Sequence, residues 1–320
     1  MKRNAGLNYL IKNFSELYWL KPVDIIWDAV TAYHVQRYIG ENDYILDLGC
    51  GDGLLSALML GGRISLEYDR FLNIKPTSQK IKKNQSGDIY SNPVSCQGLL
   101  KMPRRRIDIG LELKNHHIRV AKSLRIYDKI VKGRFEKMDL ESEIFDKAYS
   151  IFAFYWGNDL NAQFSEIRRV LKKNGEFLVT MPSEYLFDLH IAKKIADDKA
   201  YSKALKSYMN EMDGGRRRLA TRYSRTVNEW RSLIATFKLE LIEAIPVVNE
   251  ILFIQQDISQ RPFLPMFFDM QLRKSFIPRR NIVKKFLCEE VYPNFINRLL
   301  HYEGDKNIRH AYYLLRIRKR

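Results

Sequence analysis

Residues 43–53 read DYILDLGCGDG, an apolar segment that runs into three closely spaced glycines. The apolar part predicts a buried β-strand, and the following residues LLSALML (54–60) have the apolar density of a helix packed on a sheet. Gly49, Gly51 and Gly53 allow a tight turn between the two, and they let a ligand approach the backbone without meeting a Cβ atom. The helix N-terminus behind the turn offers free N–H groups. The stretch therefore predicts a ligand-binding turn at a strand end.

Strand-like and helix-like patterns alternate downstream of this turn. They predict strands at 107–113, 128–135, 145–156, 176–182, 239–248 and 311–319, and helices at 116–124, 161–173 and 228–237. The helix at 161–173 is expected to stop at Asn174-Gly175, a helix-ending pair. Such alternation is typical of an α/β fold, with a mainly parallel sheet and helices on both faces.

Two segments interrupt the regular pattern. Residues 61–103 are rich in polar and turn residues and predict an insertion after the first helix, which could serve as a lid. Residues 250–310 predict a helical insertion before the last strand; they include the apolar stretch 261–270 and the amphipathic stretch 283–300. The expected organisation is an N-terminal helical preamble (1–42), a cofactor-binding core (43–182) and a helical substrate region that holds the last strands (183–320).

The glycine turn differs from the common nucleotide-binding loops. Its G-x-G-x-G spacing is shorter than the G-x-G-x-x-G dinucleotide fingerprint, and it lacks the Gly-Lys-Ser/Thr of a phosphate loop. The pattern D-x-G-x-G-x-G resembles motif I of the class I S-adenosylmethionine-dependent methyltransferases. The resemblance implies a Rossmann-like seven-stranded sheet with an antiparallel last strand, and S-adenosyl-L-methionine bound across the carboxyl ends of the first strands.

The resemblance also implies which residues of the turn border the cofactor. They are Asp47, Gly49, Cys50, Gly51 and Gly53. The methionine part of the cofactor carries an ammonium and a sulfonium, so the Asp47 carboxylate can offset positive charge there.

In that family an acid at the end of the second strand accepts hydrogen bonds from both ribose hydroxyls. Glu67 and Asp69 follow Asp47 at the usual distance of 20 and 22 residues, whereas Glu112 follows at 65. The residues after Asp69 include Pro76 and few apolar positions, so they would make a poor crossover helix. A helix, a strand and a strong apolar strand follow Glu112 in the family's order. We therefore predict that Glu112, and not Asp69, binds the ribose.

Adenine contacts are expected next to this acid and at the end of the third strand. Leu113 would pack on the adenine face. Arg134 and Phe135 stand where the family often has Asp and a small residue, which is a departure from its pattern. Phe135 could stack on adenine instead, and Asp139 is an alternative partner for the adenine amino group.

The methyl acceptor is expected at the end of the fourth strand, IFAFYWGND (151–159). This stretch lacks the Asn/Asp-Pro-Pro-aromatic motif that serves planar amino groups of bases, which disfavours nucleic-acid methylation. Tyr155 and Trp156 suit a flat apolar wall or a sugar-stacking platform, although ordinary core packing also explains them. The sequence identifies no catalytic base, because His190 and Glu184 are isolated residues that are more often structural or solvated.

Composition restricts the partners. The net charge of +17 is typical either of a solvated basic surface or of an acidic partner such as nucleic acid, an anionic lipid surface or a phosphate-bearing substrate. Three cysteines are too few and too scattered for a disulfide framework or a zinc site, which favours a reduced, cytoplasmic setting. Adjacent His116 and His117 would point apart on a helix and make a poor metal site. No apolar stretch reaches the ~20 residues of a membrane-spanning helix.

The overall layout also resembles the methyltransferases of bacterial cell-surface polysaccharide biosynthesis. The points of likeness are the preamble LKPVDIIWDAV, the glycine turn, the long insertion before IDIGLEL, and FDKAYSIFAFYW. This second resemblance implies O-methylation of a saccharide or another small-molecule acceptor, which could be anionic or close to a membrane. An RNA methyltransferase, supported only by charge, and a subunit that has lost catalysis remain the alternatives.

Overall fold

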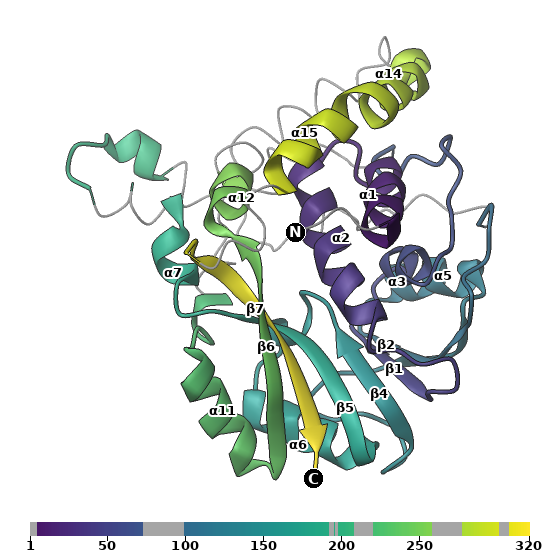
Figure 1. Cartoon of the computed structure of the whole chain (residues 1–320), viewed down its shortest axis with the longest axis vertical. Coiled ribbons are helices and arrows are strands. Elements are labelled where there is room, and N and C mark those ends of the chain that lie inside the picture. The colour runs from purple at the N-terminus through teal and green to yellow at the C-terminus, as the bar shows by residue number, and fades with distance from the viewer. Residues whose placement is uncertain are drawn as a thin grey trace.

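The computed structural model describes residues 5–72, 99–191, 195, 198–207, 220–257, 277–300 and 307–320. Its centre is one seven-stranded sheet with the strand order β3-β2-β1-β4-β5-β7-β6 (Figure 1). β7 runs antiparallel to both of its neighbours, while β1 to β5 are parallel to one another. The predicted seven-stranded α/β sheet with one antiparallel strand is therefore confirmed.

The strands lie close to the positions that the sequence predicts. They are β1 (Ile45–Leu48), β2 (Ile107–Glu112), β3 (Tyr127–Lys132), β4 (Phe145–Ser150), β5 (Leu171–Pro182), β6 (Leu239–Asn249) and β7 (His310–Lys319). All four residues of β1 are buried, because β1 is central and covered on both faces, as parallel strands require.

Helices cover both faces of the sheet (Figure 1). They include α1 (Ala5–Leu17), α2 (Pro22–Gln36), α3 (Leu54–Met59), α5 (Asn115–Leu124), α6 (Leu160–Val170), α7 (Leu186–Leu189), α11 (Val227–Thr236) and α12 (Glu250–Gln255). The start of α11 carries a capping box, in which Thr226 and Glu229 satisfy each other's backbone N–H groups.

Two of the sequence predictions are wrong in their boundaries. The strand predicted at 145–156 ends at Ser150, because Phe152 turns the chain with φ +51° and Phe154–Trp156 form a 3-10 helix, η1. The helix predicted at 161–173 ends at Val170. The Asn174-Gly175 pair lies inside β5, where the pairing with β4 changes register and Asn174 takes φ +65°.

A helical segment before β7 packs against the N-terminal helices. It consists of the 3-10 turn η3 (Ile277–Arg279), α14 (Arg280–Phe286), the π-helical turn η4 (Leu287–Val291) and α15 (Tyr292–Leu300). The predicted apolar stretch 261–270 lies outside the described residues. Of the predicted insertion at 61–103, only the two ends are described, and Arg63 and Lys101 pair across them in an antiparallel bridge.

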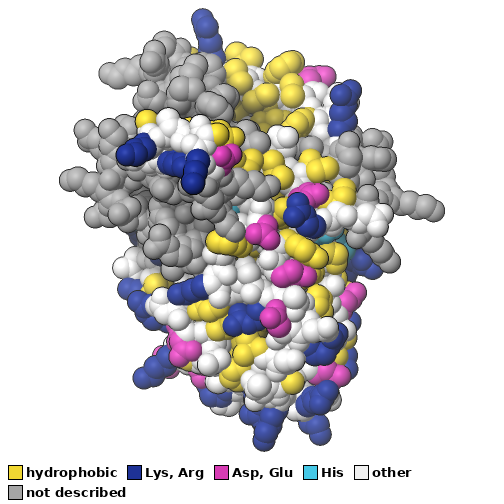
Figure 2. All heavy atoms as spheres, turned by 90° about the vertical axis from the view of Figure 1, so that its left-hand side faces the viewer, with side chains coloured by type: hydrophobic (Ala, Val, Ile, Leu, Met, Phe, Trp, Pro, Cys, Tyr) yellow, Lys and Arg dark blue, Asp and Glu magenta, His cyan; other side chains and the backbone are white. Residues whose placement is uncertain are grey.

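On one face of the molecule, charged side chains of both signs are mixed (Figure 2). Figure 2 shows the face on the left of Figure 1, where basic, acidic and apolar side chains are interspersed among the described residues. In the described helices, no segment is long and apolar enough to cross a membrane.

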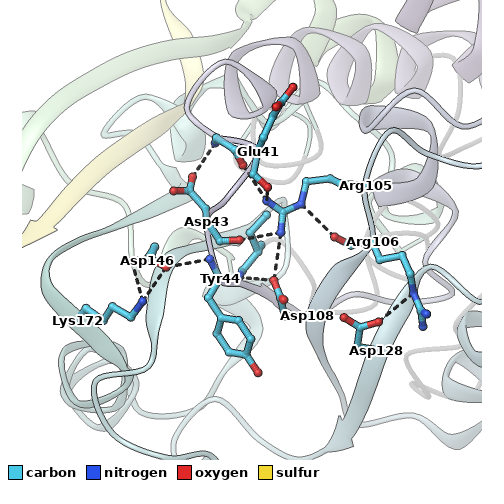
Figure 3. Close-up of polar contacts among 11 residues, drawn as sticks. Glu41, Asp43, Tyr44, Arg105, Arg106, Asp108, Asp128, Asp146 and Lys172 are labelled. Atoms are coloured by element: carbon cyan, nitrogen blue, oxygen red, sulfur yellow. Dashed lines mark hydrogen bonds and ion pairs between the residues drawn. The ribbon is translucent and has the colours of Figure 1, made fainter.

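Arg105 and Arg106, from the basic run 104–106, lie at the amino ends of the strands (Figure 3). The guanidinium of Arg105 donates hydrogen bonds to the carbonyls of Gly40, Glu41 and Asp43 and to the Asp108 carboxylate, at 2.7 to 3.2 Å. Arg105 therefore fastens the loop before β1 to the start of β2. This edge is opposite the glycine turn, and the role of Arg105 there is structural.

Candidate cofactor site

The glycine turn leaves β1 at the carboxyl edge of the sheet. Gly49, Gly51 and Gly53 all take positive φ angles, between +58° and +79°, which non-glycine residues adopt only with strain. A Cβ atom on Gly49 would lie 2.6 Å from the Cβ of Ala153, so glycine is required there by space as well. A Cβ position at Gly51 meets nothing within 4 Å, which leaves this part of the turn open to a ligand.

Glu112 lies at the end of β2, directly beside this turn. Its Oε2 accepts a hydrogen bond from the Gly51 N–H at 3.0 Å, and its Oε1 accepts from the N–H groups of Leu113 and Lys114, both at 2.8 Å. Burial by itself would raise the pKa of Glu112, but contacts with His117 and these backbone donors hold it below the usual value. The carboxylate is therefore ionised at neutral pH and fixed at the turn.

Asp69 has different surroundings. Its Oδ1 accepts from the indole N–H of Trp19 at 3.0 Å and from the Phe71 N–H at 2.9 Å. Its Oδ2 pairs with Arg280 at 2.6 Å. Both oxygens are thus bound by groups of this chain, and the side chain is buried. This placement agrees with the prediction that Glu112, rather than Asp69, serves the ribose.

Asp47 is enclosed by hydroxyl groups. Ser56 and Tyr127 donate hydrogen bonds to its Oδ2 at 2.6 and 2.7 Å, and Tyr149 donates to Ser56 at 3.0 Å. Burial raises the pKa of Asp47 to about 6, although the hydroxyl donors oppose the shift. Among the described residues no lysine, arginine or histidine forms an ion pair with this carboxylate, so a positively charged ligand group would meet an acid without a counter-charge.

The other predicted cofactor residues surround the same edge in different ways. Cys50 is buried, and burial raises the pKa of its thiol. Leu113 is 44% exposed, so its side chain is accessible to a ligand. Phe135 is half-buried and packs against Gly49 and Phe154, with its ring centroid 5.6 Å from that of Phe154. Phe135 therefore lies beside the glycine turn.

Tyr155 and Trp156 lie in η1, and not in a strand as predicted. Tyr155 is buried and stacks on Tyr312 of β7, with ring centroids 5.7 Å apart. Trp156 is 41% exposed, and its indole N–H donates to the Phe152 carbonyl at 3.0 Å. Tyr155 is therefore a core residue, whereas Trp156 exposes its ring to solvent and is accessible to a ligand.

An aromatic cluster at this edge was missed by the sequence reasoning. Trp27 of α2 packs on Phe152, on Phe253 of α12 and on Tyr312, with ring centroids 5.8 to 5.9 Å apart. These residues come from α2, the turn after β4, α12 and β7, which are far apart in the chain. No local pattern could have found them, because each looks like an ordinary core aromatic in its own segment.

The two isolated residues considered as bases have partners. His190 is buried, and its Nδ1 lies 3.6 Å from Asp257; its ring meets Phe253 edge-on at 4.8 Å. Glu184 accepts a hydrogen bond from the Tyr313 hydroxyl at 2.9 Å. Within the described ranges, no three His, Cys, Asp or Glu side chains come together as a metal site.

The seven-stranded sheet, with antiparallel β7 and with the glycine turn after β1, has the α/β fold of methyltransferases. The family described as "Methyltransferase domain" matches residues 96–179, from just before β2 through most of β5.

Individual proteins resemble the chain either over a short segment or at low sequence identity. It is 40% identical over 72 residues to a sterol 24-C-methyltransferase of Debaryomyces hansenii, covering 22% of this chain and only 18% of that protein. It is 24% identical over 221 residues to an uncharacterised protein of Methanocaldococcus jannaschii, covering 62% and 84% of the two chains. The solved structure of an S-adenosylmethionine-dependent methyltransferase from Mesorhizobium loti has 13% identity, covers 90% of this chain and 98% of that one, and superimposes with a TM-score of 0.41.

Proposed function

We propose that this protein binds S-adenosyl-L-methionine and transfers its methyl group to a saccharide or another small-molecule acceptor, by O-methylation. The observation that carries the cofactor part is the ionised Glu112 carboxylate, which is held 3.0 Å from the Gly51 N–H at the open side of the glycine turn. An acid in this position can accept hydrogen bonds from two neighbouring hydroxyls, as a ribose presents them.

The cofactor would supply a methyl group that its sulfonium already activates. The chain's own residues would bind and orient. Glu112 would hold the ribose, Leu113 and Phe135 would flank the adenine, and the buried Asp47 would favour the cationic methionine part. Most of the rate increase is then expected from positioning, for which ~7–11 kcal/mol is attainable.

The acceptor proposal is supported by exposed aromatic rings near the carboxyl edge of β4 and β5. Trp156 is 41%, Tyr185 36% and Phe187 47% exposed. Rings of this kind stack on the apolar faces of sugars, and their polar tips find hydrogen-bond partners. The second resemblance, to methyltransferases of cell-surface polysaccharide biosynthesis, agrees with such an acceptor.

Two measurements test the proposal. Titration calorimetry should detect binding of S-adenosyl-L-methionine, and its absence would refute both the enzyme and the acceptor class. Transfer of a radiolabelled methyl group should then be followed into saccharide and envelope, RNA and small-molecule fractions. Label in the saccharide or small-molecule fraction supports the proposal, whereas label confined to RNA contradicts it.

A further inference from the structure

A row of buried charges connects the helical segment before β7 with the glycine turn. Its members are Arg280 of α14, Asp69 and Arg70 after α3, and Asp52 within the turn, and none is more than 9% exposed. We infer that Arg280 is a positioning residue for the cofactor turn and acts through Asp69 and Arg70 on Asp52. The inference rests on the proposed cofactor binding.

The first link joins Arg70 to the turn itself. The Asp52 Oδ1 accepts from the Leu54 N–H at 3.2 Å and so helps to start α3. The other oxygen, Oδ2, pairs with Nη2 of Arg70 at 2.8 Å. Since Asp52 stands between Gly51 and Gly53, the position of Arg70 restrains the most deformable part of the chain at the site.

The second link fixes the segment that carries Arg70. The carboxylate of Asp69 is bound on one side by Trp19 and by the Phe71 N–H, and on the other by Nε and Nη2 of Arg280, at 2.7 and 2.6 Å. Arg280 is 211 residues distant in the sequence. The ion pair therefore holds the 69–71 backbone in the orientation that directs Arg70 at Asp52.

The helical segment that supplies Arg280 is anchored along one row of side chains spaced four apart. Lys284 donates to the Tyr68 carbonyl at 2.6 Å, next to Asp69. Cys288 contacts the Ser15 carbonyl at 3.3 Å, and Tyr292 donates to the carbonyl of Trp19. The segment therefore contacts both α1 and the 65–72 turn. These contacts hold the backbone that carries Arg280 in place.

Buried charge pairs of this kind are coupled, because each ion depends on its partner to offset the loss of water. Removing Arg280 leaves Asp69 with only neutral donors. The 69–71 backbone is then free to shift, and Arg70 loses its alignment with Asp52. Cofactor affinity should fall although no changed residue touches the cofactor.

The test compares Arg280→Met with Arg316→Met, which breaks the ion pair between β7 and Glu176 of β5 at 2.7 Å. Thermal unfolding gives the loss of stability, and calorimetry with S-adenosylhomocysteine gives the affinity. For Arg280→Met we expect affinity to fall roughly tenfold, or about 1.4 kcal/mol, and for Arg316→Met to stay within about twofold. Amide hydrogen exchange should quicken at 50–54 in Arg280→Met alone.

Further variants separate positioning from general damage. Arg280→Lys keeps the charge and should recover part of the affinity. Asp69→Asn, which keeps the shape of the side chain, applies the same test if Arg280→Met does not fold. Wild-type affinity and turn exchange in Arg280→Met or Asp69→Asn would overturn the inference while the proposed function stands. If the wild-type protein binds no S-adenosylhomocysteine, the proposed function fails first.

Discussion

At the scale of single residues, Glu112 carries two tasks at once. Its three backbone contacts shape the glycine turn and the entry to α5, and the same ionised carboxylate faces the open side of the turn. The sequence could predict that this acid ends the second strand, because the helix and strand that follow it continue the order of the fold. It could not predict that Asp69, the acid at the usual spacing, forms an ion pair with Arg280, which is distant in the chain.

Changing Glu112 to Gln should weaken cofactor binding strongly. The amide loses one acceptor and the charge, and hydrogen bonds to a charged group contribute about 1.5–3 kcal/mol each. We expect affinity for S-adenosylhomocysteine to fall by about ten- to a hundredfold in calorimetry. The control is Glu166→Gln, since Glu166 binds Arg169 and the Met138 N–H and takes no part in the site. Unchanged affinity in Glu112→Gln would contradict the ribose role.

The raised pKa of Asp47 predicts a pH dependence that distinguishes two ligands. Burial raises this pKa to about 6, so the carboxyl is protonated below that pH and ionised above it. Ionised Asp47 attracts the sulfonium of S-adenosyl-L-methionine, whereas S-adenosylhomocysteine has no such charge.

The ratio of the two affinities should therefore rise in favour of S-adenosyl-L-methionine as pH increases through about 6. Calorimetry at a series of pH values measures it. Asp47→Asn should make the ratio independent of pH, and a ratio that stays flat in the wild-type protein would exclude an electrostatic role of Asp47 toward the sulfonium.

At the scale of the elements, Glu176 of β5 is the main polar link across the sheet. It pairs with Lys147 of β4 at 2.6 Å and with Arg316 of β7 at 2.7 Å. Burial would raise the pKa of Glu176, but its partners Arg316 and Lys147 lower it to about 2. The carboxylate thus ties a parallel neighbour to an antiparallel one.

This link predicts a loss of stability in acid. The folded pKa of about 2 is below the ordinary value of 4.5, so the stabilisation is present above pH 4.5 and is lost as pH falls toward 2. Glu176→Gln should cost about 2–3 kcal/mol near neutral pH and flatten this part of the profile. Denaturant unfolding between about pH 2 and pH 7 measures both effects. If the free energy of unfolding of wild type and Glu176→Gln depended on pH in the same way, groups other than Glu176 would determine the acid sensitivity.

The strands and helices were predictable from periodicity, but two ends were not. Asn174-Gly175 usually ends a helix, yet here it forms the irregular turn of β5 while Leu171 already pairs with Phe145 of β4. The strand that begins at Phe145 stops early because Phe152 adopts a left-handed backbone conformation, and the next residue, Ala153, lies against Gly49. In both cases a tertiary contact overrides a local preference, and such contacts are absent from a local pattern.

At the scale of the whole molecule, the net charge of +17 does not gather into one basic patch on the face that Figure 2 displays. Figure 2 shows basic side chains interspersed with acidic and apolar ones on the face it displays. Dispersed charge favours weak, unspecific attraction of polyanions and lacks the continuous stripe that guides a nucleic acid to a site.

We therefore expect RNA to bind weakly and without sequence preference. Affinity should fall by roughly two orders of magnitude or more between about 50 and 200 mM salt, because the release of counterions from the phosphates favours binding less at higher salt. Filter binding with several unrelated RNAs measures this, with methyl incorporation followed in parallel. Salt-resistant, sequence-selective binding would instead support the RNA methyltransferase alternative.

The strand order also sets constraints on how the chain reaches its native state. In the part of the chain that the structure describes, β6 (239–249) pairs in the sheet with β7 alone, and the residues of β7 come some sixty positions later. Until β7 is available, β6 has no strand to pair with, and the closing of such distant contacts is slow. Refolding should then show a late phase in which the amides of β6 and β7 become protected from hydrogen exchange together. The intermediate in which β6 is still unpaired is the species most prone to aggregate and to bind chaperones.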